Sequence, residues 1–172
     1  MNSGEKATFG AGCFWKTEDA FRRLPGVLAT SVGYMGGNFP NPSYLDVLSR
    51  ITGHAEVAQI AHNPHEISYE ALLAVFWSIH DPTQLNRQGP DRGEQYRSII
   101  FYHTPEQKLI ATAGKRQLQL SGKFQQDIVT LIEPAGDYYL ADQSHQQYLE
   151  KKQARSVEDF QKKISRQDRG IM

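Results

Sequence analysis

The sequence predicts an α/β (α+β) two-layer sandwich, a ferredoxin-like mixed or antiparallel sheet with helices packed against it. Segments typical of strands and of helices alternate along the chain. The length of 172 residues suits one domain, and 39% hydrophobic with 22% charged content supports a buried core. We therefore expect a single domain over residues 1–172, with a core over about 5–150 and a C-terminal tail over about 151–172.

Strand signals recur at five places. They are β-branched and aromatic runs bounded by glycine, proline or asparagine. Because His54 and Glu56 lie two residues apart, they should share one face of their strand. Loops containing Pro40 and Gly93 precede the third and fourth strands and bring polar groups to them. The predicted strands are Lys6–Gly10, Val27–Tyr34, His54–Ala61, Tyr96–Tyr102 and Ile128–Glu133.

Helical spacing follows three of these strands. The first helix is predicted from Phe14 to Leu24, which places Cys13 at a strand-to-helix junction. Ser68 is the expected N-cap of a second helix that ends before Asp81. Thr104-Pro105-Glu106-Gln107 opens a third, which should run to about Gly122. The glutamine-rich tail from Gln143 to Lys163 is expected to form solvent-facing helix interrupted by linkers.

Composition excludes several classes of function. Nineteen basic and nineteen acidic side chains balance, so the chain offers no basic groove for nucleic acid. The longest apolar run, around Leu72–Phe76, is far shorter than the roughly 20 residues that cross a bilayer. The polar N-terminus lacks a secretory signal core, which predicts a cytoplasmic protein. A single cysteine excludes an internal disulfide and a multi-thiolate zinc site.

Cys13 is the first candidate catalytic residue. It lies in Gly12-Cys13-Phe14-Trp15 at the expected start of a helix, where free N–H groups and the helix dipole favour the thiolate. Phe14 and Trp15 could form an apolar wall beside the sulfur. The alternative for an isolated cysteine is a small buried hydrophobic residue.

Glu56 is the candidate acid. It stands on a predicted strand next to Val57 and Ala58, where burial would raise its pKa and let it donate a proton. Tyr44 and Tyr96 lie where loops meet regular elements and could present hydroxyls to the same site. Taken singly, each of these residues has a structural alternative, namely a solvated carboxylate or a packed phenol.

Five blocks of sequence together resemble one family. They are GCFW at 12–15, GYMGG at 33–37, NPSY at 41–44, TGHAE at 52–56 and HDPTQLNRQGPDRGEQYRS at 80–98. In order and spacing they are similar to the signatures of the A-type peptide methionine sulfoxide reductases, in a single-cysteine form. A weaker match continues at 141–149 (ADQSHQQYL), where the family tends to have an aromatic residue at the position of Ser144.

The resemblance implies a site and a reaction. Cys13 would attack the sulfur of methionine sulfoxide, free or in oxidised proteins, and Glu56 would protonate the leaving oxygen. Tyr44 and Tyr96 would hydrogen-bond to that oxygen, and Asp91 would support the polar pocket. Phe14 and Trp15 would hold the substrate's methyl group. The product would be methionine from the S epimer, with Cys13 left as a sulfenic acid.

The chain departs from the family in its tail. Many members carry a resolving cysteine near the C-terminus, whereas this chain has none between Gln143 and Met172. The resemblance therefore implies no bound cofactor and an external thiol reductant, either thioredoxin or glutathione with a glutaredoxin. Other departures are Lys16, Leu48, Arg50 and Ile51, none of which removes a predicted catalytic residue. We expect a monomer with no nucleic-acid or membrane partner.

Other functions are compatible with single features. A Cys–His hydrolase or transferase would use His54 or His145 as the base for Cys13. A binding module would use the Phe14 and Trp15 wall to hold oxidised methionine without turnover. A thiol peroxidase would exploit a reactive Cys13. The combination of Cys13, Glu56 and the two tyrosines favours the reductase.

Overall fold

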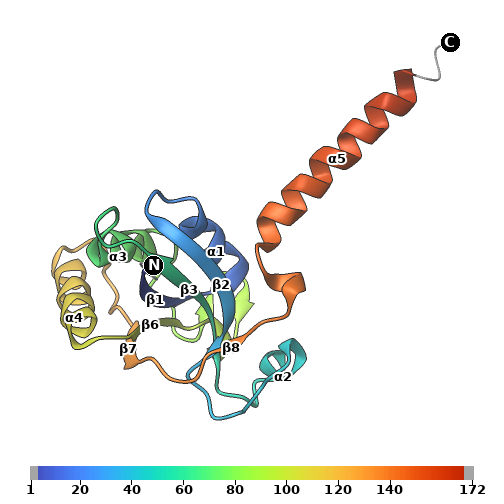
Figure 1. The fold of residues 1–172 in the computed structure, drawn as a ribbon. Coiled ribbons are helices and arrows are strands. Elements are labelled where there is room, and N and C mark those ends of the chain that lie inside the picture. The colour runs from blue at the N-terminus through green and yellow to red at the C-terminus, as the bar shows by residue number, and fades with distance from the viewer. Residues whose placement is uncertain (1–3, 169–172) are drawn as a thin grey trace.

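A computed structural model describes residues 4–168, and the three N-terminal and four C-terminal residues lie outside the described part of the chain. One six-stranded sheet dominates, in the order β7-β6-β1-β3-β2-β8 (Figure 1). All neighbouring strands are antiparallel except β6 and β7, which are parallel. The expected mixed sheet with helices packed against it is confirmed.

The segment β1-α1-β2-β3-α3-β6 has the ferredoxin-like topology, because its strands lie in the order β6-β1-β3-β2. The strands of the main sheet are β1 Glu5–Ala11, β2 Val27–Met35, β3 Ala55–His62, β6 Ser98–Tyr102, β7 Leu131–Pro134 and β8 Tyr139–Leu140. The helices are α1 Phe14–Arg22, α2 Tyr44–Leu48, α3 Tyr69–Ser78, α4 Pro105–Leu120 and α5 Tyr148–Asp168. A small hairpin of β4 Arg87–Gln88 and β5 Asp91–Arg92 leads into the 3₁₀ turn η1 Glu94–Tyr96.

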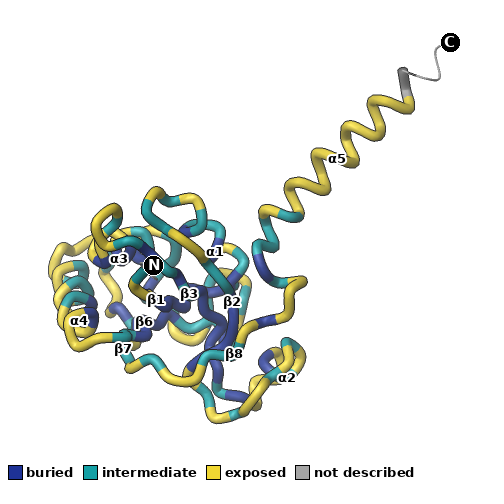
Figure 2. Tube along the Cα trace, in the orientation of Figure 1, coloured by how far each residue is buried: buried dark blue, intermediate teal, exposed yellow. Residues whose placement is uncertain are grey.

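The sheet separates two apolar clusters. On the helix-covered face, Phe9, Phe21 and Phe76 stack beneath α1 and α3 with ring centroids 5.1–5.3 Å apart. On the other face, a smaller cluster around Val57 and Ile99 is covered by the segment between β7 and β8. Figure 2 shows the buried residues concentrated on the central strands. The strands therefore alternate between two buried faces, and Glu56 belongs to the face that carries the helices.

Local capping explains where the helices begin. Ser68 caps α3 by accepting a hydrogen bond from the Ala71 N–H, and Thr104 caps α4 by accepting one from the Gln107 N–H, both as expected. Helix α2 is an addition to the predicted elements. Ser43 and Asp46 form a capping box there, and this short S-x-x-D pattern is the sequence signal for a helix in a stretch interpreted as loop.

Two predicted strands begin at least two residues later in the structure. Tyr96 lies in η1, so β6 begins only at Ser98, and the last predicted strand begins at Leu131 instead of Ile128. The tail from Gln143 contains the 3₁₀ turn η2 Gln143–His145, a break at Gln146 and Gln147, and then the continuous helix α5, whose N-terminal turn packs on the body of the protein, so the expected interruption is confirmed at one place. The reason in each case is tertiary, since side-chain patterns locate apolar runs but not the hydrogen bonds that end a strand or helix.

Beyond its first turns, α5 projects from the body and is exposed on nearly all sides (Figures 1 and 2). Val157, Phe160 and Ile164 form an exposed apolar stripe on it. Within the described part of the chain, no helix combines the length and the apolar character required to cross a membrane. The predicted tail at 151–172 falls partly on residues 169–172, which lie outside the described residues.

Candidate active site

Cys13 is the N-cap residue of α1, directly after β1. Gly12, with φ of +93°, makes the sharp turn between the two elements, and a Cβ there would lie 2.8 Å from the Cβ of Gln88. Glycine therefore permits the hairpin to pack against the turn. The predicted strand-to-helix junction is confirmed, with the thiol partly buried at the start of the helix.

Burial of Cys13 opposes the expected effect of the helix start on its thiol. Burial raises the pKa of the thiol to about 11, and the charges of Glu56 and Asp91 raise it further. The N–H groups of Trp15 and Lys16 act in the expected, lowering direction, but burial outweighs them. At neutral pH the resting Cys13 is therefore a protonated thiol.

Glu56 is almost completely buried, on the face of β3 that faces α1. Its Oε1 accepts a hydrogen bond of 3.2 Å from the Phe14 N–H, in the first turn of the helix that Cys13 caps. Its Oε2 has no hydrogen-bond partner in the described chain. Burial raises the pKa of this carboxyl to about 8, the Phe14 N–H lowers it, and Asp91 raises it. The upward shift agrees with the sequence prediction that burial would raise the pKa of Glu56.

Cys13 and Glu56 both act electrostatically on Tyr44 and Tyr96. Tyr44 begins α2 and Tyr96 ends η1. Burial raises the pKa of both phenols, followed by the charge of Glu56, and Cys13 and Asp91 also act on each. The five predicted polar residues are therefore close enough to act on one another electrostatically, although they come from separate elements.

Tyr34 is a buried neighbour that the sequence reasoning missed. It pairs with Glu56 across β2 and β3, and its ring lies 5.7 Å from that of Phe14. Its hydroxyl is buried without a partner among the described residues, and burial and Glu56 both raise its pKa. The GYMGG block contained this tyrosine, but its predicted strand gave no reason to assign it to the site.

The two aromatic residues after Cys13 have different surroundings. Phe14 is fully buried against Tyr34, whereas Trp15 is partly exposed and stacks on Tyr148 with ring centroids 3.8 Å apart. The Trp15 Nε1–H donates a 3.1 Å hydrogen bond to His145 Nδ1. The His145 ring lies 4.5 Å from Tyr44. His145 and Tyr148 thus complete an aromatic cage that only the weak ADQSHQQYL match could have indicated.

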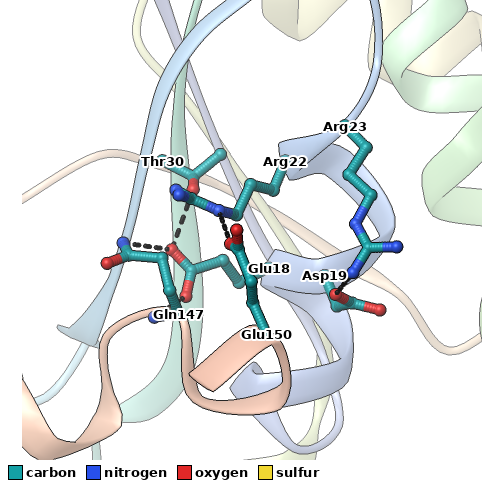
Figure 3. A network of polar contacts seen from close by, with 7 residues as sticks. All are labelled: Glu18, Asp19, Arg22, Arg23, Thr30, Gln147 and Glu150. Atoms are coloured by element: carbon teal, nitrogen blue, oxygen red, sulfur yellow. Dashed lines mark hydrogen bonds and ion pairs between the residues drawn. The ribbon is translucent and has the colours of Figure 1, made fainter. Parts of the chain in front are cut away.

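A C-terminal clamp, formed by Gln146 and Gln147 with their partners, holds this part of the cage in place. The buried Gln146 amide pairs with the backbone of Val32, accepting from its N–H and donating to its C=O at 2.8 Å each. Glu18 of α1, also buried, accepts from the Gln147 N–H and from the Thr30 hydroxyl (Figure 3). Residues from the end of the chain are therefore fixed beside the start of α1.

Both ring nitrogens of His54 make hydrogen bonds that stabilise the fold. Its Nδ1 accepts from the Gly37 N–H at 2.9 Å, so its Nε2–H donates to the Phe39 C=O at 2.7 Å. Both ring nitrogens are thus occupied by the loop that precedes α2, and the ring cannot serve Cys13 as a base. In the described chain, no hydrogen bond links the Cys13 thiol to His145 either.

Taken together, these groups define a class of protein. A thiol with a raised pKa lies within electrostatic range of a buried carboxyl and two phenols, beside aromatic side chains. Such a site suits a thiol oxidoreductase whose substrate has a polar oxygen on an apolar group, because the oxygen needs donors and its substituents need an apolar surface.

Comparison with known proteins specifies the family. The family model of peptide methionine sulfoxide reductases matches residues 5–170. The peptide methionine sulfoxide reductase MsrA 1 of Nostoc sp. is 66% identical over 88% of this chain and 93% of its own. The MsrA of Methanothermobacter thermautotrophicus is 62% identical, covering 86% and 87%. The chain belongs to the peptide methionine sulfoxide reductase family, and its activity is the reduction of the S epimer of methionine sulfoxide, which repairs oxidised protein.

Solved structures agree with this assignment. Reduced Mxr1 from Saccharomyces cerevisiae superposes with a TM-score of 0.80 at 37% identity, covering 86% of this chain and 84% of Mxr1. Mxr1 in complex with Trx2 superposes with a TM-score of 0.59 at 28% identity, covering 84% of each chain.

Proposed function

We propose that Cys13 is the nucleophile and Glu56 the proton donor in the reduction of the S epimer of methionine sulfoxide, free or in proteins. The sulfoxide oxygen is a poor leaving group until it is protonated, and Glu56 keeps its proton until the pH approaches its pKa of about 8. Its unpaired Oε2 is the oxygen available for that proton transfer.

Cys13 and Glu56 together account for the atoms and protons of the proposed reduction step. The Cys13 sulfur attacks, the S–O bond of methionine sulfoxide breaks, and methionine and a Cys13 sulfenic acid result. The oxygen gains a proton from Glu56 while the thiol loses one, and the Glu56 carboxylate so formed is close enough to influence the thiol's pKa. The raised pKa of Cys13 thus assigns a second task to Glu56, recovery of the proton that the thiol releases.

Tyr44 and Tyr96 would donate hydrogen bonds to the oxygen as negative charge develops on it. Their raised pKa values keep both phenols protonated, so that both remain donors. Asp91 acts electrostatically on Cys13, Glu56 and both tyrosines, which supports a role in the same pocket. Phe14 and Trp15 would bind the methyl group, with His145 and Tyr148 holding Trp15 in orientation.

An external thiol would return Cys13 to the reduced state, because the chain has no second cysteine. The likeness to Mxr1 in its complex with Trx2 supports a thioredoxin as that reductant. We propose the cytoplasm as the place of the reaction. Glutathione with a glutaredoxin is the second candidate. The unit that carries this chemistry would be residues 5–150, since the predicted and matched site residues all fall within it.

The buried, protonated Glu56 next to the thiol is the observation that carries the proposal. The test is a single turnover without reductant, with the S and R epimers of a methionine sulfoxide substrate supplied separately. We expect one methionine per enzyme from the S epimer alone, with Cys13 trapped as a sulfenic acid. An intact thiol and no methionine from either epimer would contradict it and favour a binding module.

A further inference from the structure

Cys13 also borders a second space, on the side of the β4–β5 hairpin. A cavity of about 180 Å³ lies between the first turn of α1, the end of α3 and this hairpin. Its lining includes Cys13, Lys16, Thr17, Ile79, Pro90 and Asp91. Glu56, Tyr44 and Tyr96 are absent from the described residues that line it. We call it the hairpin-side cavity.

We propose that the hairpin-side cavity receives the reducing thiol, a cysteinyl side chain or a small thiol, that attacks the Cys13 sulfenic acid. The inference rests on the proposed function, which generates that acid. It assigns the substrate and the reductant to different sides of one sulfur atom, with Asp91 bordering both, because it lines the cavity and acts electrostatically on Glu56.

The direction of attack supports this assignment. In the sulfenic acid, Cys13 carries an oxygen that Glu56, Tyr44 and Tyr96 are placed to hydrogen-bond. A thiolate displaces this oxygen by adding its electron pair to the S–O antibonding orbital, whose open lobe lies opposite the oxygen. The thiol must therefore approach from a side that the acid and the phenols do not occupy, and the cavity reaches Cys13 with none of these three residues in its described lining.

Size and charge also suit a thiol. The volume equals roughly six water molecules at ~30 Å³ each, enough for a cysteinyl side chain but too small for a drug-sized ligand. Lys16 is exposed at the lining, where its ammonium can attract an incoming thiolate. Lys16 acts on the pKa of Cys13 only through its backbone N–H, so the cation can serve the reductant.

The chemistry balances with two thiols. The first thiolate forms a mixed disulfide with Cys13, and the oxygen leaves as water after gaining a proton from Glu56. A second thiol then attacks the sulfur of the first, which releases Cys13 as a thiol and one disulfide of the reductant. Two thiols are oxidised, the sulfenic acid is reduced by two electrons, and one water forms.

An introduced cysteine tests the route. Pro90→Cys places a thiol in the cavity lining, and Ser144→Cys places a matched exposed thiol beside His145, on the cage side of Trp15. Each variant makes one turnover with methionine sulfoxide and no external reductant. Mass spectrometry then identifies the state of Cys13, and Pro90→Ser controls for loss of the proline. Should the proline be required for folding, Gly89→Cys takes the place of Pro90→Cys.

We expect Pro90→Cys to form a disulfide between Cys13 and the introduced thiol after releasing one methionine, while Ser144→Cys keeps the sulfenic acid. A disulfide in Ser144→Cys alone, in both variants equally, or in neither despite methionine release would overturn the inference. Absence of methionine from the unmodified protein would instead contradict the proposed function, and the inference with it.

A second measurement tests the role of the positive charge of Lys16. Lys16→Glu should lower the second-order rate constant for reduction of the Cys13 sulfenic acid by dithiothreitol several-fold, and the loss should shrink at high salt. A rate constant that does not respond to this charge reversal would show that the thiol enters elsewhere.

Discussion

The site contains two buried polar regions that differ in how well their hydrogen bonds are satisfied. In the C-terminal clamp, the Gln146 amide uses its oxygen and its nitrogen on the backbone of Val32 and Ala141. Beside Cys13, Glu56 Oε2 and the Tyr34 hydroxyl are buried with no partner in the described chain. Both regions have similar burial, and only the second leaves polar atoms unpaired.

This difference distinguishes polar residues that stabilise the fold from polar residues that are proposed to take part in the reaction. A buried polar group whose hydrogen bonds are complete stabilises one arrangement of the chain, whereas an unpaired one costs free energy of folding. That cost is justified where the free atom must meet a substrate, as Glu56 Oε2 would. The clamp should therefore govern stability, and the acid should govern turnover.

The largest effect should come from Glu56→Gln. Glutamine can still accept the Phe14 N–H but cannot protonate the sulfoxide oxygen, so single-turnover methionine formation should slow by about 10²–10⁴-fold. Alkylation of Cys13 by a small electrophile, measured in parallel, should change far less. Equal losses in the two assays would mean that Glu56 acts on the thiol.

An intermediate effect is expected in the clamp. Gln146→Ala leaves the buried N–H of Val32 without its partner and removes one of the two hydrogen bonds to the Val32 C=O, which still accepts from the Ala141 N–H. This should lower the free energy of unfolding by about 1–3 kcal/mol in urea denaturation. The matched control is Gln143→Ala, whose side chain is exposed. Equal stability of the two variants would show that the clamp is dispensable.

The last expected effect is a pH-dependent gain in stability. The folded pKa of Glu56, about 8, lies above its unfolded value of about 4.5, so the folded state holds the proton more tightly. Stability from this group is complete below pH 4.5 and falls as the pH rises towards 8.

Glu56→Gln removes this loss. The free energy of unfolding of this variant should match that of the wild type near pH 4.5 and exceed it at pH 8 by at least ~1 kcal/mol. The exposed Glu5→Gln should show no such trend. A constant difference across this pH range would argue that Glu56 is not buried in its neutral form.

Part of the fold and of the candidate site could be predicted from the sequence alone. The alternation of apolar runs and the caps at Ser68 and Thr104 predicted the sheet and its helices. The family resemblance of the blocks around Cys13, Tyr44, Glu56 and Tyr96 implied the enzyme class. These signals are local, since a cap or an alternating strand is defined by residues within a few positions of one another.

Tertiary structure decided the rest. Whether Cys13 is a thiol or a thiolate depends on how burial outweighs the N–H groups of α1, and that balance is set by neighbours distant in sequence. Tyr34, His145 and Tyr148 reach the site only because β2 pairs with β3 and the clamp ties the chain end to α1. Burial and long-range pairing depend on the whole packed chain, which no short sequence pattern encodes.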